Sequence, residues 1–492
     1  MGLGIPTPGA PRRAGRAGLA VLSCSLLGLP AGSCAGPADG ALRLRPVPHF
    51  APAAHDAGGR AGTGSGAVQS GTSGTHGSTA LPLPEGEELG LADLLELAHG
   101  RSPAVRAAEE ALRSAAERRA QETALPDPML RFGLFAESVQ TRTGSQEWTA
   151  SLSQALPWPG KLAVRGELAD LARDEARVRS WIAARDVLVE VTRSYHELVY
   201  LHGALAIGLE VEELARRLVQ LAAAGREGAR TGLPEEVRAE TFLAQLAYDR
   251  AALEELLFVE EERLRSLCAL PPETPLGRPR GLSLPAFELQ LAPLREAAVQ
   301  HNQELMLAAL HVDAARAQQR AAELRSRPDL ELGARFIATD ALAGSADPDN
   351  GEDPLLIELG LRLPVWGAAN RAAASEARSN LRAARHRRDL RLETLRADLA
   401  QAWWEAAAAE RLARLYRGSL LPQAERAARA AEGLYEAGET GFAGLLETAA
   451  AWQHFQLAAL RAEADYGRAL ARLEQLVGLP LAALPGPPGG QP

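Results

Sequence analysis

The sequence predicts a mainly α-helical chain that carries a smaller membrane β-sheet portion and is built from two structural repeats, at about residues 86–285 and 286–482. Three observations support this fold class. A helix, two short strands, a much longer helix and a further helix follow one another twice along the 492 residues. Alanine, leucine, glutamate and arginine dominate, whereas aromatic residues make up only 4%, a balance that favours extended helices. Four segments show the two-residue alternation of strands.

The duplication is visible when landmarks of the first half are laid on the second half in the same order. They are Leu91–Leu94 with Leu291–Leu294, Leu125–Asp127 with Arg327–Asp329, Leu156–Gly160 with Leu363–Gly367, Arg230–Leu233 with Glu439–Phe442, and Leu270–Pro271 with Leu479–Pro480. The spacing between them drifts by only a few residues, all of which can be placed in loops or turns. Agreement at separated places indicates an internal repeat, which has to be recognised before a fold is assigned.

Residues 1–35 predict a secretory signal peptide. Arginines at positions 12–16 precede an apolar stretch that ends in the small residues Ala31–Ala35, and this stretch is too short to span a membrane. Cys34 and Cys24 are candidate lipidation sites of a lipoprotein signal. Because neither follows a leucine-led lipobox, simple cleavage of the signal without lipidation is the open alternative.

Two segments outside the repeats are predicted to be disordered. Residues 36–85 are rich in glycine, serine, alanine and proline without an apolar period, which is typical of a flexible tether, and the tail 483–492 is similar. His49, His55 and His76 lie in the tether at irregular spacing, so solvated linker histidines are favoured over a metal site.

The four strand segments are predicted at about 128–138 and 147–156 in the first repeat, and at about 329–338 and 354–363 in the second. Alternation over about ten residues with one apolar face is typical of outer-membrane strands, and an amphipathic strand of a soluble sheet is the alternative. Four strands cannot close a barrel, since the smallest common membrane barrels use about eight. An open apolar sheet would aggregate, so the pattern predicts an oligomer that shares one barrel.

Tryptophans stand at the ends of these strand segments. They are Trp148, Trp158 and Trp366. An aromatic belt at the membrane interface would place them there, and packing within the protein is the alternative.

Each repeat contains one predicted helix that is much longer than the others, from Pro157 to about Ala222 and from about Trp366 to Glu432. Apolar residues recur there every three or four positions, which predicts continuous helices of about 65 residues and on the order of 100 Å. The shorter helices of the first repeat, roughly 87–124 and 234–268, reach around 110 Å if stacked end to end. The pattern predicts a curved wall of antiparallel helices, with a soluble helical bundle or spacer rod as the alternative.

Composition and motifs exclude several classes of function. The formal charge of -9 is interspersed, and no basic stripe of the kind that nucleic acids require is present. The ten histidines do not cluster, and the chain has no nucleophile elbow, phosphate loop or zinc motif. We therefore expect no enzymatic activity, no cofactor and no metal site. Cys268 is a lone thiol on a helix, so no structural disulfide is expected.

Several motifs carry a resemblance to a known family. They are Pro126–Pro128 at the start of a strand, Gln154–Lys161 at the return into a helix, Leu363–Trp366 with Asn370–Arg371 in the second repeat, and Tyr466–Leu470 with Leu473–Gly478 near the end. Over about residues 87–480 the chain resembles the TolC-type outer-membrane efflux family, the outer membrane factors of tripartite efflux pumps. Within that family it is most similar to the metal-exporter branch.

The resemblance implies a homotrimer that forms a 12-stranded β-barrel on a long α-helical barrel. It implies a passive channel in the outer membrane of a Gram-negative-type bacterium, with a periplasmic helical extension, that conducts metal cations or small toxic molecules to the exterior. The implied partners are outer-membrane lipid, a periplasmic adaptor (membrane fusion) protein and an inner-membrane pump, of the proton-driven RND type. The alternative function is a periplasmic helical scaffold or spacer without a pore.

The same resemblance assigns roles to two turns, at about 223–233 and 432–442, which would form the periplasmic tip. The implied adaptor-contacting residues are Gly228, Thr231, Gly232, Gly438, Thr440 and Gly441. The candidate entrance gate consists of Glu425, Glu432, Glu436 and Glu439, which threefold symmetry would arrange as an acidic ring that favours cations. Helix termination by the glycines and ordinary solvated glutamates are the alternatives. Gly444 departs from the family pattern, in which an acidic residue often follows the second turn.

Overall fold

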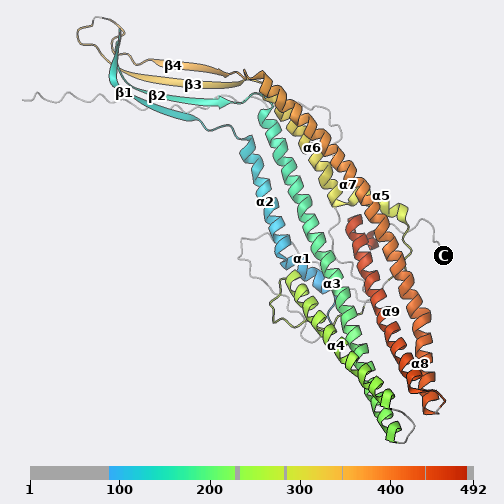
Figure 1. Cartoon of the computed structure of the whole chain (residues 1–492). Coiled ribbons are helices and arrows are strands. Elements are labelled where there is room, and N and C mark those ends of the chain that lie inside the picture. Colours follow the sequence, from blue (N-terminus) through green and yellow to red (C-terminus); the bar gives the residue numbers. More distant parts are fainter. Residues whose placement is uncertain (1–87, 228–232, 282–284, 346, 438, 485–492) are drawn as a thin grey trace, which may run out of the picture. The chain divides into compact units, whose positions relative to one another are not determined.

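The computed structural model describes residues 88–227, 233–281, 285–345, 347–437 and 439–484. This part of the chain is mainly helical and contains one antiparallel sheet (Figure 1), which confirms the coarse fold class. Within these ranges, no helix combines the length and the apolar character that crossing a membrane requires. The predicted signal peptide and tether lie outside the described residues, and so do Cys24 and Cys34.

The elements of the two repeats follow one another in the same order. The first repeat contains α1 (Leu91–Arg101), α2 (Pro103–Thr123), β1 (Met129–Thr141), β2 (Gly144–Leu156), α3 (Lys161–Glu227) and α4 (Leu233–Leu267). The second contains α5 (Leu291–His301), α6 (Gln303–Leu324), β3 (Asp329–Asp340), β4 (Leu355–Arg362), α7 (Gly367–Leu415), the π-helical turn η1 (Tyr416–Leu420), α8 (Leu421–Glu436), α9 (Phe442–Val477) and the short 3₁₀ helix η2 (Leu481–Ala483).

The prediction of one unbroken helix over 87–124 is wrong, because Ser102 separates α1 from α2. Ser102 has φ −54° and ψ 124°, and the following Pro103 explains this, since a residue before proline is pushed out of the helical region. The second repeat breaks at the corresponding Asn302. There the side-chain oxygen of Asn302 accepts a hydrogen bond from the backbone N–H of Leu305 at 2.9 Å, so Asn302 is the N-cap of α6.

The predicted helix as far as Glu432 is present without a gap, but it is not a regular α-helix throughout. The first long helix, α3, does run unbroken for 67 residues, but its counterpart changes to a π-helical turn at η1 before α8 begins. Pro422 stands at the start of α8, and the sequence prediction left it out of account. Proline has no N–H to donate and clashes with the preceding turn, so the regular hydrogen-bond ladder cannot pass through this point.

The sheet has the order β1-β2-β3-β4, and all three pairings are antiparallel. The register places Leu130 opposite Leu152, Trp148 opposite Ala338 and Leu332 opposite Leu359. Since alternate residues of a strand share one face, the apolar residues of all four strands gather on the same face. This face is largely uncovered, with Leu130 exposed by 74% and Ile357 by 78%.

The helices pack along one another, and α3 and α9 are the central elements. Helix α3 contacts α2, α4, α6 and α9, while α9 contacts α7 and α8 as well (Figure 1). The start of α1 and the end of α4 meet on α3 in a core that includes Leu94, Tyr195, Leu264 and Cys268. Helices α1–α2 and α4 therefore follow each other along α3.

Glycines allow α3 and α9 to approach closely. A Cβ atom at Gly467 of α9 would lie 2.3 Å from the ring of His196, and one at Gly203 of α3 would lie 2.7 Å from Leu460. Both distances are shorter than real Cβ contacts, so a larger residue at either position would require the His196 or Leu460 side chain, or the helices themselves, to shift. The two contacts are seven residues apart on each helix, which is the spacing of a coiled-coil seam.

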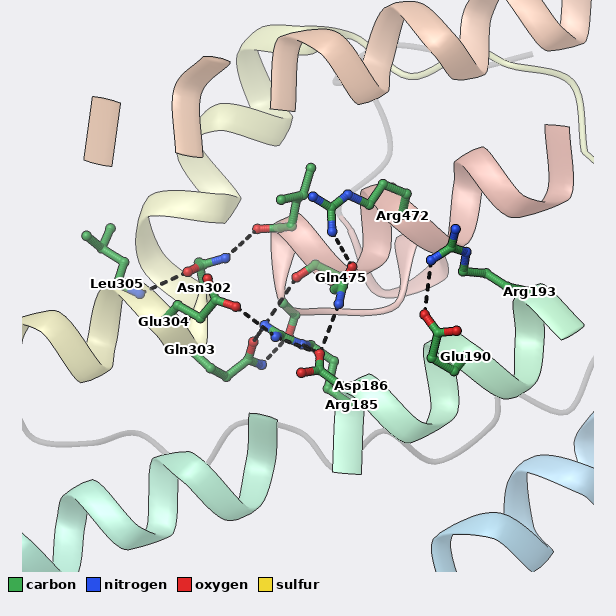
Figure 2. Close-up of polar contacts among 12 residues, drawn as sticks. Arg185, Asp186, Glu190, Arg193, Asn302, Gln303, Glu304, Leu305, Arg472 and Gln475 are labelled. Atoms are coloured by element: carbon green, nitrogen blue, oxygen red, sulfur yellow. Dashed lines mark hydrogen bonds and ion pairs between the residues drawn. The ribbon is translucent and has the colours of Figure 1, made fainter. Parts of the chain in front are cut away.

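A buried polar joint ties the end of α9 to both repeats (Figure 2). Arg185 of α3 is only 2% exposed and donates to the side-chain oxygen of Gln303 at 2.9 Å and to the carbonyl of Gln475 at 3.3 Å. Asn302 donates to the carbonyl of Leu476, and Gln303 donates to that of Gly478. Side chains thus satisfy carbonyl groups that the last turn of a helix leaves without partners.

Candidate functional site

The turn between α8 and α9 contains two of the predicted tip residues, Thr440 and Gly441. The backbone N–H groups of Glu439 and Thr440 donate to the carbonyl of Leu434 at 2.8 and 3.3 Å, which closes α8. Gly441 is the N-cap of α9 with φ −78°, and a Cβ atom added there would meet nothing within 4 Å. The backbone geometry of Gly441 does not require glycine. What glycine provides here is an open surface without a side chain. Gly228, Thr231, Gly232 and Gly438 lie outside the described residues.

A small core joins the helices that flank the two predicted tip turns. It contains Leu218 of α3, Ala239 of α4, Ala431 of α8, and Phe442 and Leu445 of α9. These residues come from α3, α4, α8 and α9, so the ends of these four helices pack against one another.

A groove next to this core holds two of the four predicted gate glutamates. It is lined by residues of α3, α8 and α9 and encloses about 780 Å³. Glu425 and Glu432 line it, while Glu439 is exposed on the turn, and the side chain of Glu436 lies outside the described part. Glu425 forms an ion pair with Arg429, so the acidic character of the groove is partly neutralised.

Sequence reasoning missed the residues that α3 and α9 contribute to this groove. Glu210 and Arg217 of α3 and Trp452 of α9 line it together with Glu425 and Glu432. The sequence does show that each pair shares one helix face. Glu210 and Arg217 are seven residues apart, and so are Glu425 and Glu432. Only the packing of α3 and α8 against α9 shows that the two faces line one groove.

The sheet forms the second candidate site. Its apolar face carries Trp148, whose ring lies between those of Phe132 and Phe336 at centroid distances of 5.4 Å. On the opposite face Arg335 pairs with Glu358 at 3.1 Å. Strands β1 and β4 each have a neighbour on one side only among the described strands. The sheet therefore offers one apolar face, one polar face and two open edges.

The three tryptophans at the predicted strand ends have different surroundings. Trp148 packs against rings on the apolar face, whereas Trp366 at the start of α7 is 79% exposed. The backbone N–H of Trp158 donates to the carboxylate of Asp329 at 2.8 Å, and Lys161 binds the same oxygen at 2.8 Å. This contact fixes the passage from β2 into α3 against the start of β3.

The described residues hold no group of three or more histidine, cysteine, aspartate or glutamate side chains that could bind a metal ion. His196 is buried against Gly467 and Tyr195, and burial, followed by the nearby Arg468, lowers its pKa to about 4. A neutral imidazole packed between helices is a core residue. Burial likewise raises the pKa of the Cys268 thiol to about 11, which leaves it unreactive.

Comparison with known proteins connects this architecture to a family. Residues 294–479 match the family model described as outer membrane efflux protein. The second repeat is therefore similar to the outer membrane efflux proteins. The members of this family are transport proteins and not enzymes, which agrees with the expectation that the chain has no enzymatic activity. No curated protein sequence matches the chain.

Solved structures share the fold over most of the chain. The outer membrane protein VceC from Vibrio cholerae has a TM-score of 0.66 at 18% identity, covering 79% of this chain and 96% of VceC. The open state of the Neisseria gonorrhoeae MtrE outer membrane channel gives 0.64 at 19% identity, covering 80% and 89%. The Campylobacter jejuni CmeC outer membrane channel gives 0.66 at 15% identity, covering 79% and 85%. The shared fold includes the first repeat, which the family model does not reach.

The resemblance to the TolC-type family is thereby supported at the level of the outer membrane efflux proteins. The finer expectation of a metal-exporter branch is not resolved, because CusC, with a TM-score of 0.66 at 14% identity, is one of several comparable matches.

Proposed function

We propose that the chain is the outer-membrane channel of a tripartite efflux system and that three copies assemble around one pore. The sheets of the three copies form a 12-stranded β-barrel in the outer membrane of a Gram-negative-type bacterium. Their helices form a tube that extends into the periplasm. The channel is passive, and its cargo consists of metal cations or small toxic molecules that a partner pump delivers.

The sheet is the observation that carries this proposal. Its apolar face is uncovered along all four strands, and both edges are open within the described chain. Such a sheet would aggregate in water, whereas lipid can cover the face and neighbouring copies can pair with β1 and β4. Closing the sheets into one barrel removes every edge, which is the condition for strands to span a bilayer.

The partners follow from the arrangement of the helix turns. A periplasmic adaptor protein docks at the tip, through Thr440 and Gly441 of the second turn and through Gly228, Thr231, Gly232 and Gly438. An inner-membrane pump of the proton-driven RND type supplies the energy. The core of Leu218, Phe442 and their neighbours packs the helices that flank the two turns against one another, and this supports a single docking surface.

We also propose an acidic entrance formed by Glu425, Glu432, Glu436 and Glu439. Threefold symmetry multiplies each carboxylate by three, and a ring of carboxylates attracts cations. The groove that holds Glu425 and Glu432 supports a second role for these two residues, because a groove of this size also suits an adaptor helix.

Conductance in planar bilayers tests the channel, using detergent-purified protein whose oligomeric state has been fixed by crosslinking. We expect a trimer with discrete current steps and a preference for K⁺ over Cl⁻. The double substitution Glu425→Gln with Glu432→Gln should reduce this preference, while Glu110→Gln on α2, where the side chain is 67% exposed, should not.

The outcomes separate the parts of the proposal. A species that fractionates with soluble periplasmic proteins and gives no current steps would contradict the channel and support the scaffold. Current steps with unchanged ion preference in the double variant would remove the acidic entrance, and loss of adaptor crosslinking in the same variant would assign the groove to docking.

A further inference from the structure

A second pocket lies beside the polar joint, between α3, α7 and α9, and encloses about 430 Å³. Its charged residues are Arg193 of α3, Glu405 of α7, and Asp465, Arg468 and Arg472 of α9, with small alanine side chains between them. This volume is in the range of pockets that hold small organic molecules, which is roughly 300–1,000 Å³.

The pocket opens on one particular face of the helices. Extended segments cover the other face, where Tyr195 donates to the carbonyls of Leu89 and Arg280, Trp403 to that of Leu289, and Tyr466 to that of Pro285. In each of the three helices a pocket residue stands two positions from this aromatic residue, which is about 200° around the helix axis. In the proposed tube the extended segments would block the lumen if they lay inside, so the pocket faces the lumen.

Most charges around the pocket neutralise one another. The paired groups are Arg461 and Arg468 with Glu197 and Asp465, and Arg193 with Glu190. These ion pairs hold the helices together and leave little net charge to attract a ligand, because each carboxylate already has one or two guanidinium partners.

Two charged side chains of the pocket, one positive and one negative, have no oppositely charged partner among the described residues. Arg472 donates to the neutral side chain of Gln475 at 2.5 Å, and Glu405 accepts from the neutral side chain of Gln401 at 2.7 Å. Neither has an oppositely charged side chain within ion-pair distance among the described residues. The pocket thus presents one cation and one anion, held apart on α9 and α7.

The polar joint holds Arg472 in position (Figure 2). Gln475, which accepts from Arg472, donates to Asp186 at 3.0 Å, and Asp186 accepts from Arg185 at 2.8 Å. Because the side chain of Arg185 is only 1% exposed, this chain of contacts ends in a fixed, buried group. A guanidinium that is oriented in advance loses less entropy when it binds an anion.

We propose that this pocket is a lumenal binding site for small zwitterions that carry a carboxylate and an ammonium group. The carboxylate binds Arg472 and the ammonium binds Glu405. The lumenal position rests on the proposed channel, and the pocket then selects amphoteric molecules among the cargo of that channel.

Three related probes test the proposal: L-phenylalanine, 3-phenylpropanoate, which lacks the amine, and 2-phenylethylamine, which lacks the carboxylate. Their affinities for the detergent-purified full chain are measured by saturation-transfer NMR. We expect L-phenylalanine to bind about tenfold more tightly than either analogue, as a charge-assisted contact predicts. Arg472→Gln should remove this advantage over 2-phenylethylamine, and Glu405→Gln should remove it over 3-phenylpropanoate.

The control is Arg113→Gln, which removes the same charge from α2, where the side chain is 72% exposed, and should change no affinity. Equal binding of the three probes to the unmodified chain, or unchanged selectivity in both pocket variants, would overturn the proposal. Current steps recorded on the same preparation keep the two ideas distinguishable. Steps without probe selectivity leave the channel intact and reject the site, whereas selectivity without steps supports the site and contradicts the channel.

Discussion

At the residue scale, the two repeats differ in the residue that takes a positive φ directly after a helix. Helix α4 is followed by Cys268, Ala269, Leu270 and Pro271, and Ala269 has φ 50°, the only positive φ of a non-glycine residue in the described chain. The matching position after α9 is Gly478, with φ 84°. A side chain in the left-handed region costs about 1–2 kcal/mol, so the first repeat tolerates a strain that the second avoids.

Ala269→Gly and Gly478→Ala should have opposite effects on the stability of the fold. Ala269→Gly relieves the strain, and because glycine costs about 0.5–1 kcal/mol of chain entropy, we expect a net stabilisation of up to about 1 kcal/mol. Gly478→Ala adds a Cβ atom 2.3 Å from the carbonyl oxygen of His301, so we expect a loss of about 2 kcal/mol or more. Thermal unfolding in detergent measures both, and an equal shift in the two variants would contradict this explanation.

His196 should make the stability of the helix pair depend on pH. Burial lowers its pKa to about 4 from an ordinary value of 6.5, so between these values the unfolded chain takes up a proton that the folded chain does not. Stability is therefore full above pH 6.5 and falls as the pH decreases towards 4, by about 2 kcal/mol at pH 5 at roughly 1.4 kcal/mol per pH unit. Unfolding midpoints at pH 7 and pH 5 measure this loss.

The matched variant for this prediction is His196→Gln. It removes the titrating group, so its midpoint should change less between pH 7 and pH 5 than that of the unmodified chain. If both proteins lose the same stability, other groups dominate the acid response.

At the element scale, the sheet depends on strict alternation. Leu359 and Leu332 are opposite each other on the apolar face, and Thr149 pairs with Gly133 and Ile337 on the other face. A shift by one residue would exchange the two faces. The chemistry of each face therefore decides what the strands can contact.

Charged substitutions on the two faces should separate lipid contact from lumen contact. Leu359→Arg places a charge on the proposed lipid face, which costs about 2–4 kcal/mol at the middle of a bilayer, so the protein should no longer be recovered in outer membranes. Thr149→Arg, on the other face, should still be recovered there. Equal recovery of the two variants would show that the apolar face does not contact lipid.

At the scale of the whole molecule, α4 carries apolar side chains that no part of the described chain covers. Tyr248 is 71% exposed, Phe258 63% and Val259 61%. Tyr248 and Val259 are eleven residues apart, about three turns, and so share one face of the helix. Apolar patches of this kind mark interaction surfaces, and in the proposed trimer a neighbouring copy covers them.

The double substitution Tyr248→Glu with Val259→Glu should prevent trimer formation, because it would bury two carboxylates in that interface. Mass photometry in detergent measures the oligomer directly. The control Gln121→Glu adds a negative charge on exposed α2 and should leave the trimer intact. A trimer that persists in the double variant would place the subunit interface elsewhere.

The sequence alone determined the duplication, the predominance of helices and the two faces of the strands. These properties depend on local periodicity, which the order of residues close together in the sequence shows directly. Local chemistry also explains why α1 and α2 are separated at Ser102 and why the helix is irregular before Pro422, although the spacing of the apolar residues shows neither feature.

Only the tertiary structure decided which helix faces meet. Arg468 pairs with Glu197 across 271 residues of sequence, and Glu210 meets Glu432 in one groove. That Arg472 and Glu405 lack an ionic partner becomes visible only once the ion pairs of Arg193, Asp465 and Arg468 are known. Such contacts depend on the rotation and register of helices in three dimensions, which the close approach at Gly203 and Gly467 sets and which no local pattern encodes.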